Sequence, residues 1–313
     1  MTGGRGYNTY TYGDEGVPMS AGNGEYKDRL FNFLFGSEEN RAWTLSLYNA
    51  VNGSAYDDPS QITFTTIREV MYLGMHNDVS FLVAGEMSLY EQQSSFNPNM
   101  PLRMLQYLGN LYQRHVDERR LNKYGSALIP LPAPRLVVFY NGGRERPDEE
   151  VLRLSDAFPA GAKSDVEVRV RAVNVNWGHS RKLLAACAPL REYAWLVARV
   201  REGGAADPGA DLGVAIDRAI DAMPDDYEIK PFLTANKAEV RGMLLTEYDE
   251  AKAMELFREE GLREGRLEGR REGVVTAMLS LVKDGLLPVA DAARRAGMTV
   301  AEFERVAAEL TLT

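Results

Sequence analysis

The 313-residue sequence contains a single cysteine, Cys187, and only three histidines. One cysteine excludes both an intrachain disulfide framework and a zinc site built from several cysteines, and the histidines lack the spacing of a zinc-protease motif. No uninterrupted apolar run reaches the ~20 residues that a membrane-spanning helix requires. The first residues also lack the basic and apolar segments of a secretory signal. We therefore expect a cytoplasmic protein without a membrane partner, in which Cys187 lies inside an apolar helix.

Positive charge is also scarce. The chain has 36 Lys and Arg residues against 45 Asp and Glu residues, a formal net charge of −9. This sign excludes a protein that coats nucleic acid through bulk charge, although it is compatible with an enzyme that holds DNA on a local basic strip. Hydrophobic residues make up 45% and charged residues 26%, which is the composition of a globular protein rather than of a disordered chain.

The central part of the chain carries both helical and strand periodicities. Helices are predicted over residues 26–35, 38–51, 98–115 and 180–201. Strands are predicted over residues 62–73, 78–83, 87–94, 136–140 and 165–176. This order of elements favours an α/β or α+β core of ~180 residues that is followed by further helices.

Changes in composition divide the chain into five parts. We expect a flexible leader (1–24), an α/β core (25–205), a helical extension (206–257), a Gly/Glu/Arg-repeat helix (258–273) and a small helical unit (274–313). In the extension, helices are predicted over 212–222 and 235–257. In the last unit, Thr299 and Glu302 have the spacing of a helix capping box, and the surrounding sequence has some features of a helix-turn-helix. Its final helix is acidic, which disfavours binding in a DNA major groove.

The repeat helix contains glycine at every fourth position. The glycines are Gly261, Gly265, Gly269 and Gly273, and they follow Glu260, Glu264, Glu268 and Glu272. A spacing of four places the glycines on one stripe of a helix, where each costs ~1 kcal/mol relative to alanine. The segment is either a solvated charged connector or a helix that packs closely on another. The second alternative predicts a homo-oligomer formed through the C-terminal helical region.

Residues 77–93 contain acidic side chains that two neighbouring strands would bring together. The strands 78–83 and 87–94 are separated by a short glycine-containing turn, which predicts a hairpin. Glu91 and Gln93 are two residues apart, so they share one face of their strand.

The turn decides where Asp78 lies. A two-residue turn at Ala84-Gly85 would set Asp78 opposite Glu91, and a turn at Gly85-Glu86 would set it opposite Gln93. A three-residue turn would place Asp78 on the other face unless a bulge restored the alternation.

Two carboxylates that approach each other repel, and a divalent cation removes this conflict. Mg²⁺ or Mn²⁺ binds such oxygen ligands, and it can activate water and stabilise the charge that develops on a phosphodiester. Gln93 would orient the attacking water or contact a phosphate oxygen. The alternative is that Asp78, Glu91 and Gln93 are polar residues on the solvated face of an amphipathic hairpin.

Six segments resemble the Rpn family of recombination-promoting nucleases, also described as transposases, within the PD-(D/E)XK nuclease superfamily. They are YKDRLFNFLFG (26–36), SLYNAVNGS (46–54), MHNDVSFLVAGEMSLYEQQSSFNPNMPLR (75–103), PRLVVFYNG (134–142), LRLSDAF (152–158) and the Glu-Gly repeat. The resemblance implies a restriction-endonuclease-like α/β fold, a mixed sheet flanked by helices, with a helical C-terminal extension. It implies a Mg²⁺-dependent DNA endonuclease linked to recombination, transposition or mobile-element biology.

The same resemblance assigns roles to residues of the hairpin. Asp78 and Glu91 fall on the metal-binding acids of the superfamily, and the backbone carbonyl of Gln92 falls on a further metal ligand. Gln93 takes the position that is usually lysine, which departs from the superfamily pattern, although Glu-x-Gln looks like a variant of this family. Because glutamine carries no charge, its role is limited to hydrogen bonding and positioning.

Three further residues are accessory candidates. Glu25 and Asp28 would supply an acid from the first helix, or they simply favour the dipole at the start of that helix. Arg103 would contact a phosphate, or it forms a surface salt bridge. A different class of function also fits the chain, namely a catalytically silent nuclease fold that binds DNA or acts as an oligomerising scaffold.

Overall fold

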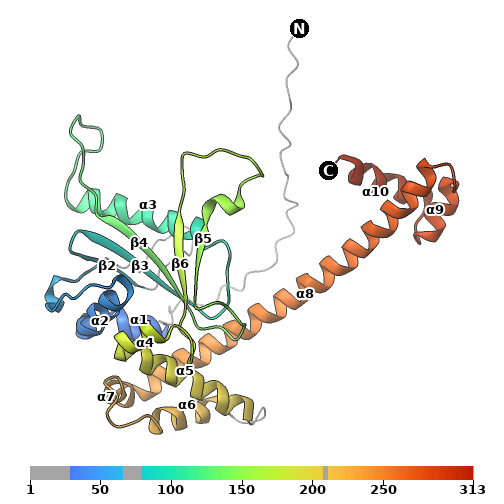
Figure 1. Cartoon of the computed structure of the whole chain (residues 1–313). Helices are drawn as coiled ribbons and strands as arrows, with labels where there is room; N and C mark the ends of the chain where they lie inside the picture. The colour runs from blue at the N-terminus through green and yellow to red at the C-terminus, as the bar shows by residue number, and fades with distance from the viewer. Residues whose placement is uncertain (1–28, 66–78, 207–210, 313) are drawn as a thin grey trace.

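The structure, a computed structural model, describes residues 29–65, 79–206 and 211–312. Its centre is an open six-stranded sheet with strand order β1-β2-β3-β4-β6-β5 (Figure 1). The strands are β1 (Thr63–Phe64), β2 (Val79–Val83), β3 (Glu86–Gln93), β4 (Ala133–Tyr140), β5 (Glu149–Arg153) and β6 (Arg169–Asn174). The pairs β3–β4 and β4–β6 are parallel, and the other pairs are antiparallel. The expected α/β class, with a mixed sheet flanked by helices, is confirmed.

Helices cover both faces of the sheet (Figure 1). On one face lies α3 (Met100–Glu118), which packs its buried side chains on Leu89 and Val138. The other face carries α1 (Leu30–Phe35), α2 (Arg41–Asn52), α4 (Arg181–Ala186) and α5 (Ala188–Ala206). These helices surround Tyr90 and Phe139. Neighbouring strand residues thus enter opposite cores, as the alternation of a strand requires. Outside α5 lie α6 (Leu212–Asp221), α7 (Lys230–Ala235) and the first part of α8 (Lys237–Lys283).

The β2–β3 hairpin has the two-residue turn Ala84-Gly85. Both residues have positive φ, 50° and 78°, as the tight turns that match the twist of a hairpin require. Val83 therefore pairs with Glu86, and the register continues to Val79 opposite Tyr90. This is the first of the two registers considered for the hairpin. Asp78 lies outside the described residues.

The prediction differs from the structure at β5 and around Cys187. The sequence pattern did not predict β5, because this edge strand is half-exposed and its residues Glu149–Arg153 are mostly charged. The single helix expected over 180–201 is two helices that break at Cys187, whose backbone is extended. Pro189 explains the break, since its ring cannot follow a preceding helical turn. The expectation that Cys187 lies inside a helix is therefore wrong. Cys187 is nevertheless fully buried, and burial raises the pKa of its thiol to about 11.

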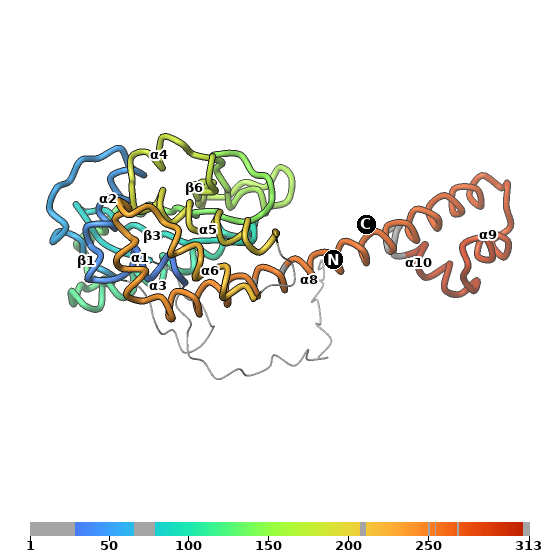
Figure 2. Tube along the Cα trace, turned by 90° about the horizontal axis from the view of Figure 1, so that it is seen from below, coloured from blue at the N-terminus to red at the C-terminus, as the bar shows by residue number. Residues whose placement is uncertain are grey.

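The helix α8 is a single element of 47 residues, about 70 Å long at 1.5 Å per residue. It runs without a break from the core through the glycine repeat, and Figure 2 shows it extending away from the sheet. At its far end it packs against α9 (Val289–Arg295) and α10 (Val300–Leu312) around a small separate core that includes Phe303. The capping box is confirmed, since Thr299 and Glu302 exchange hydrogen bonds at the start of α10. Among the described helices, none has an apolar stretch long enough to span a membrane.

The loops that follow β3 and β4 touch at Gly142. A Cβ atom at this position would fall well inside contact distance of the Ser94 carbonyl oxygen and of the Tyr140 ring. A Cβ at the neighbouring Gly143 would meet nothing within 4 Å. Only a glycine at position 142 therefore allows the two loops to meet.

We predict that Gly142→Ala lowers the free energy of unfolding by about 1–3 kcal/mol, the usual range for overpacking. Chemical denaturation monitored by circular dichroism measures this change, and Gly143→Ala is the matched control, expected to be nearly neutral. Equal destabilisation by both substitutions would contradict the close approach of the loops.

Candidate active site

The parallel strands β3, β4 and β6 bring their carboxyl ends to the same edge of the sheet. Ligands of open α/β sheets bind at this edge, because the loops that follow the strands diverge there. In this chain the edge is formed by Gln93, Tyr140 and Asn174 and the loops that follow them. Glu91 lies on β3, two residues before its end.

Glu91 is a buried carboxylate that faces α3. Only 3% of the residue is exposed, and its Oε1 accepts a hydrogen bond of 2.6 Å from Nη2 of Arg103. Arg103 lies in the first turns of α3 and also donates to the Tyr107 hydroxyl at 2.8 Å. An ionised carboxylate is found in such a position only when a partner compensates its charge. Arg103 is therefore a partner of the candidate site and not a surface salt bridge.

Gln93 shares the face of Glu91, as predicted. It is also buried, and its Nε2 lies 2.7 Å from the sulfur of Met100 in α3. The solvated-face interpretation of Glu91 and Gln93 is therefore wrong, since neither side chain lies on an exposed face of the hairpin.

Gln92 points to the opposite face and joins a buried chain of polar groups. Its Nε2 donates to Oδ1 of Asn141 at 2.6 Å, and Nδ2 of Asn141 donates to the Tyr193 hydroxyl at 2.7 Å. These bonds link the ends of β3 and β4 to α5. The satisfied buried network fixes the backbone at the end of β3, where the carbonyl predicted to bind a metal lies.

Arg29 is a residue of the site that sequence reasoning missed. Its Nη1 donates to the backbone carbonyl of Gln92 at 2.7 Å. Arg29 precedes α1, and Glu247 of α8 accepts the amide of the next residue, Leu30, at 2.9 Å. The sequence offered one indication of this role, since Arg29 lies within the segment YKDRLF, directly after the acidic candidate Asp28.

These side chains line an open pocket of about 640 Å³. Two guanidinium groups, from Arg29 and Arg103, and one carboxylate, from Glu91, contribute to its wall together with the loop at residues 94–98. Arginine presents paired N–H donors that match the oxygens of a phosphate group. The pocket therefore has the chemistry to hold a phosphodiester beside a carboxylate.

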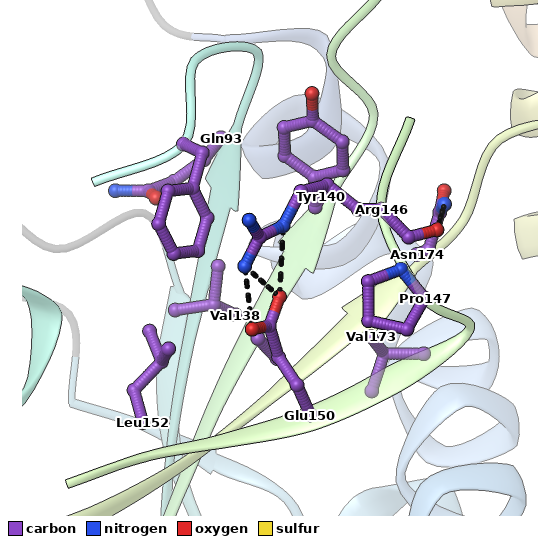
Figure 3. Close-up of a pocket in the computed structure, with 11 residues that line it drawn as sticks. Gln93, Val138, Tyr140, Arg146, Pro147, Glu150, Leu152, Val173 and Asn174 are labelled. Carbon is purple, nitrogen blue, oxygen red and sulfur yellow. Dashed lines mark hydrogen bonds and ion pairs between the residues drawn. The ribbon is translucent and has the colours of Figure 1, made fainter. Parts of the chain in front are cut away.

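The loop wall is held by Arg146. Its guanidinium carbon lies 3.7 Å from the centre of the Phe96 ring, and the guanidinium also binds Glu150 of β5. Figure 3 shows this ion pair beside Gln93 and Tyr140, around a small cavity of about 10 Å³. Such a volume holds about one water molecule. Arg146 thus holds Phe96, and with it the loop that follows β3, against β5.

The donor chemistry fits part of a magnesium site. The Glu91 carboxylate and the Gln92 carbonyl are hard oxygen ligands, the type that Mg²⁺ prefers, and Mg²⁺ commonly uses only one or two carboxylates. Both oxygens accept hydrogen bonds from arginine, Glu91 from Arg103 and the Gln92 carbonyl from Arg29, and a cation bound there would displace these guanidinium groups. Within residues 29–65, 79–206 and 211–312, no three His, Cys, Asp or Glu side chains group as metal ligands. The predicted acids Glu25, Asp28 and Asp78 lie outside these residues.

Comparisons with protein-family models, with curated proteins and with solved structures found no match to this chain. The resemblance to the Rpn nucleases therefore remains a prediction from the sequence.

We predict that Arg103→Ala lowers the free energy of unfolding by about 3 kcal/mol in EDTA, because the buried Glu91 carboxylate loses its compensating charge. Adding Mn²⁺ should restore part of this loss, since a bound cation would supply the missing positive charge. The double variant Arg103→Ala/Glu91→Gln is the control and should be more stable than Arg103→Ala alone. Thermal unfolding that is identical for Arg103→Ala and the unmodified protein would show that Arg103 does not compensate Glu91.

Proposed function

We propose that this protein is a Mg²⁺-dependent DNA endonuclease that hydrolyses phosphodiester bonds. The observation that supports it best is the buried Glu91 carboxylate in a pocket that Arg29 and Arg103 also line. The backbone carbonyl of the next residue, Gln92, accepts a hydrogen bond from the same Arg29. This combination provides oxygen ligands for a cation and N–H donors for a phosphate at the end of β3. The resemblance of the sequence to recombination-promoting nucleases supports the same chemistry.

The residues take the following roles in this proposal. Glu91, the carbonyl of Gln92 and Asp78 would hold the metal, which when bound lowers the pKa of water and stabilises charge on the phosphate. Arg29 and Arg103 bind the phosphate oxygens by charge-assisted hydrogen bonds. Gln93 positions water or phosphate through its amide, and its uncharged side chain leaves proton transfer to other groups.

The biological setting proposed with this activity is recombination, transposition or the movement of genetic elements. That part depends on the sequence resemblance alone.

Plasmid nicking tests the proposal. We expect purified protein to nick supercoiled DNA in Mg²⁺ or Mn²⁺ and not in EDTA, and we expect Glu91→Ala and Asp78→Ala to abolish nicking. Glu86→Gln is the matched control, because Glu86 lies on the same strand as Glu91 but at its other end, paired with Arg135. Nicking by Asp78→Ala or Glu91→Ala at the unmodified rate would reject the site.

A second proposed role is self-assembly through the exposed part of α8. Every described side chain from residue 255 to residue 274 is exposed, including Phe257 and Leu267 at 68% and 63%. Two antiparallel copies of this segment centred on Gly265 would have complementary charges. The facing pairs would be Glu260 with Arg270, Glu264 with Arg266, and Glu272 with Arg258. The glycines have open space around them in the single chain, so a second helix has room to approach closely.

We predict that the full chain forms a homo-oligomer and that a chain ending after residue 257 is monomeric. The shortened chain keeps the part of α8 that packs on the core, including Val240 and Leu244, and should therefore still nick DNA. Sedimentation velocity measures the first effect and the plasmid assay the second. A monomeric full chain would rule out assembly through α8 without affecting the nuclease proposal.

A further inference from the structure

Three arginines form a straight row across neighbouring strands, far from the candidate active site. Arg153 on β5 lies directly opposite Arg169 on β6. The parallel register of β4 and β6, in which Val137 pairs with Arg171, brings Arg135 level with Arg169. We call Arg135, Arg153 and Arg169 the arginine row, and all three residues are exposed.

The arginine row lies on a part of the sheet that none of the described helices covers. It shares the face that carries α2 and α5, but it is at the amino ends of β4 and β6, beyond the end of α2. An open hollow of about 440 Å³ is lined there by Val51, Asn52, Arg135, Arg169 and Arg171. Figure 1 shows β5 and β6 extending past α4 and α5. The row is therefore on the opposite face from Glu91 and at the opposite end of the strands.

The fold gives no reason for this concentration of positive charge. Like charges directly opposite each other on neighbouring strands destabilise a sheet. Arg153 and Arg169 make no ion pair with any of the described residues. In a chain with a net charge of −9, two such arginines side by side point to a ligand that neutralises them.

The acid Glu86 compensates one member of the row, Arg135, whereas no ion pair between described residues compensates Arg153 or Arg169. Glu86 binds Arg135 and also accepts the Tyr48 hydroxyl at 2.6 Å. Glu149 binds Arg171 at 2.7 Å. Glu167 accepts the hydroxyl of Ser155 at 2.7 Å, and this bond, with a smaller contribution from Arg169, lowers the pKa of its carboxyl. Arg153 and Arg169 thus face each other without an ion pair inside the described part of the chain.

The spacing and the surroundings of the row favour a duplex nucleic acid. Adjacent strands are about 4.8 Å apart, so the three side chains start along a line of about 10 Å and can reach successive phosphates of one strand. The residues that line the hollow include no aromatic side chain. Single-stranded DNA or RNA is usually held by stacking of its bases on aromatic rings. A surface of arginines without aromatics instead suits contacts to the phosphates of a duplex.

We infer that the arginine row is a binding surface for the phosphate backbone of duplex DNA, independent of DNA sequence. This surface is separate from the Glu91 pocket. It does not depend on the proposed nuclease activity, because it requires neither the metal nor Glu91.

Fluorescence anisotropy of the full chain with a short labelled DNA duplex, in EDTA and over a range of KCl concentrations, tests this inference. Arg153→Ala/Arg169→Ala should weaken binding about tenfold or more. It should also reduce the salt slope, which is the steepness with which the logarithm of the binding constant falls with the logarithm of the KCl concentration, by roughly 1.8, since each lost phosphate contact contributes ~0.9. Arg153→Lys/Arg169→Lys should keep most of the slope because it keeps the charge.

The control separates the row from net charge. Arg181→Ala/Lys182→Ala removes two exposed positive charges from α4 and should change binding less than twofold. The alanine variant of the row should also unfold at the same or a higher temperature, since like charges are removed. An unchanged salt slope, or equal weakening of binding in the α4 variant, would overturn the inference. Lower thermal stability of the alanine variant of the row would also overturn it. The same holds if single-stranded DNA or polyglutamate competes for binding as well as an unlabelled duplex does.

Discussion

The candidate site depends on one physical constraint, which is that the Glu91 carboxylate is buried away from water. Burying an ionised group is costly unless a partner compensates its charge, and the Arg103 guanidinium does so at 2.6 Å. This need for compensation connects β3 to the first turns of α3. It also gives the pocket a carboxylate whose partner can be exchanged, since a cation can take the place of the guanidinium.

Contacts on the opposite face of β3 hold the end of the strand, and with it Glu91, in place. The side chain of Gln92 is bound to Asn141, which follows β4 and in turn binds Tyr193 of α5. The carbonyl of Gln92 is bound to Arg29, which directly precedes α1. Gly142 lets the loops after β3 and β4 meet. The position of Glu91 thus results from parallel strand pairing, a buried polar network and one close backbone contact.

The sequence predicted the local features well and the long-range ones poorly. The glycine turn defined the hairpin, and strand alternation placed Glu91 and Gln93 on one face, because both rules depend on neighbouring residues. The edge strand β5 was missed, since its exposed, charged residues do not alternate clearly. The glycine repeat was predicted as a helix, but its continuity with the helical segments on both sides was missed, because the changes in composition suggested separate parts. Arg29 could not be assigned, because its contact is with a residue 63 positions away.

Calorimetric titration of Mn²⁺ into the full chain tests the central claim most directly, because it does not depend on DNA or on turnover. The account predicts one saturable site in the unmodified protein, loss of that site in Glu91→Gln, and its retention in Glu86→Gln. Binding of the same affinity and stoichiometry in Glu91→Gln, or no binding in the unmodified protein, would contradict it.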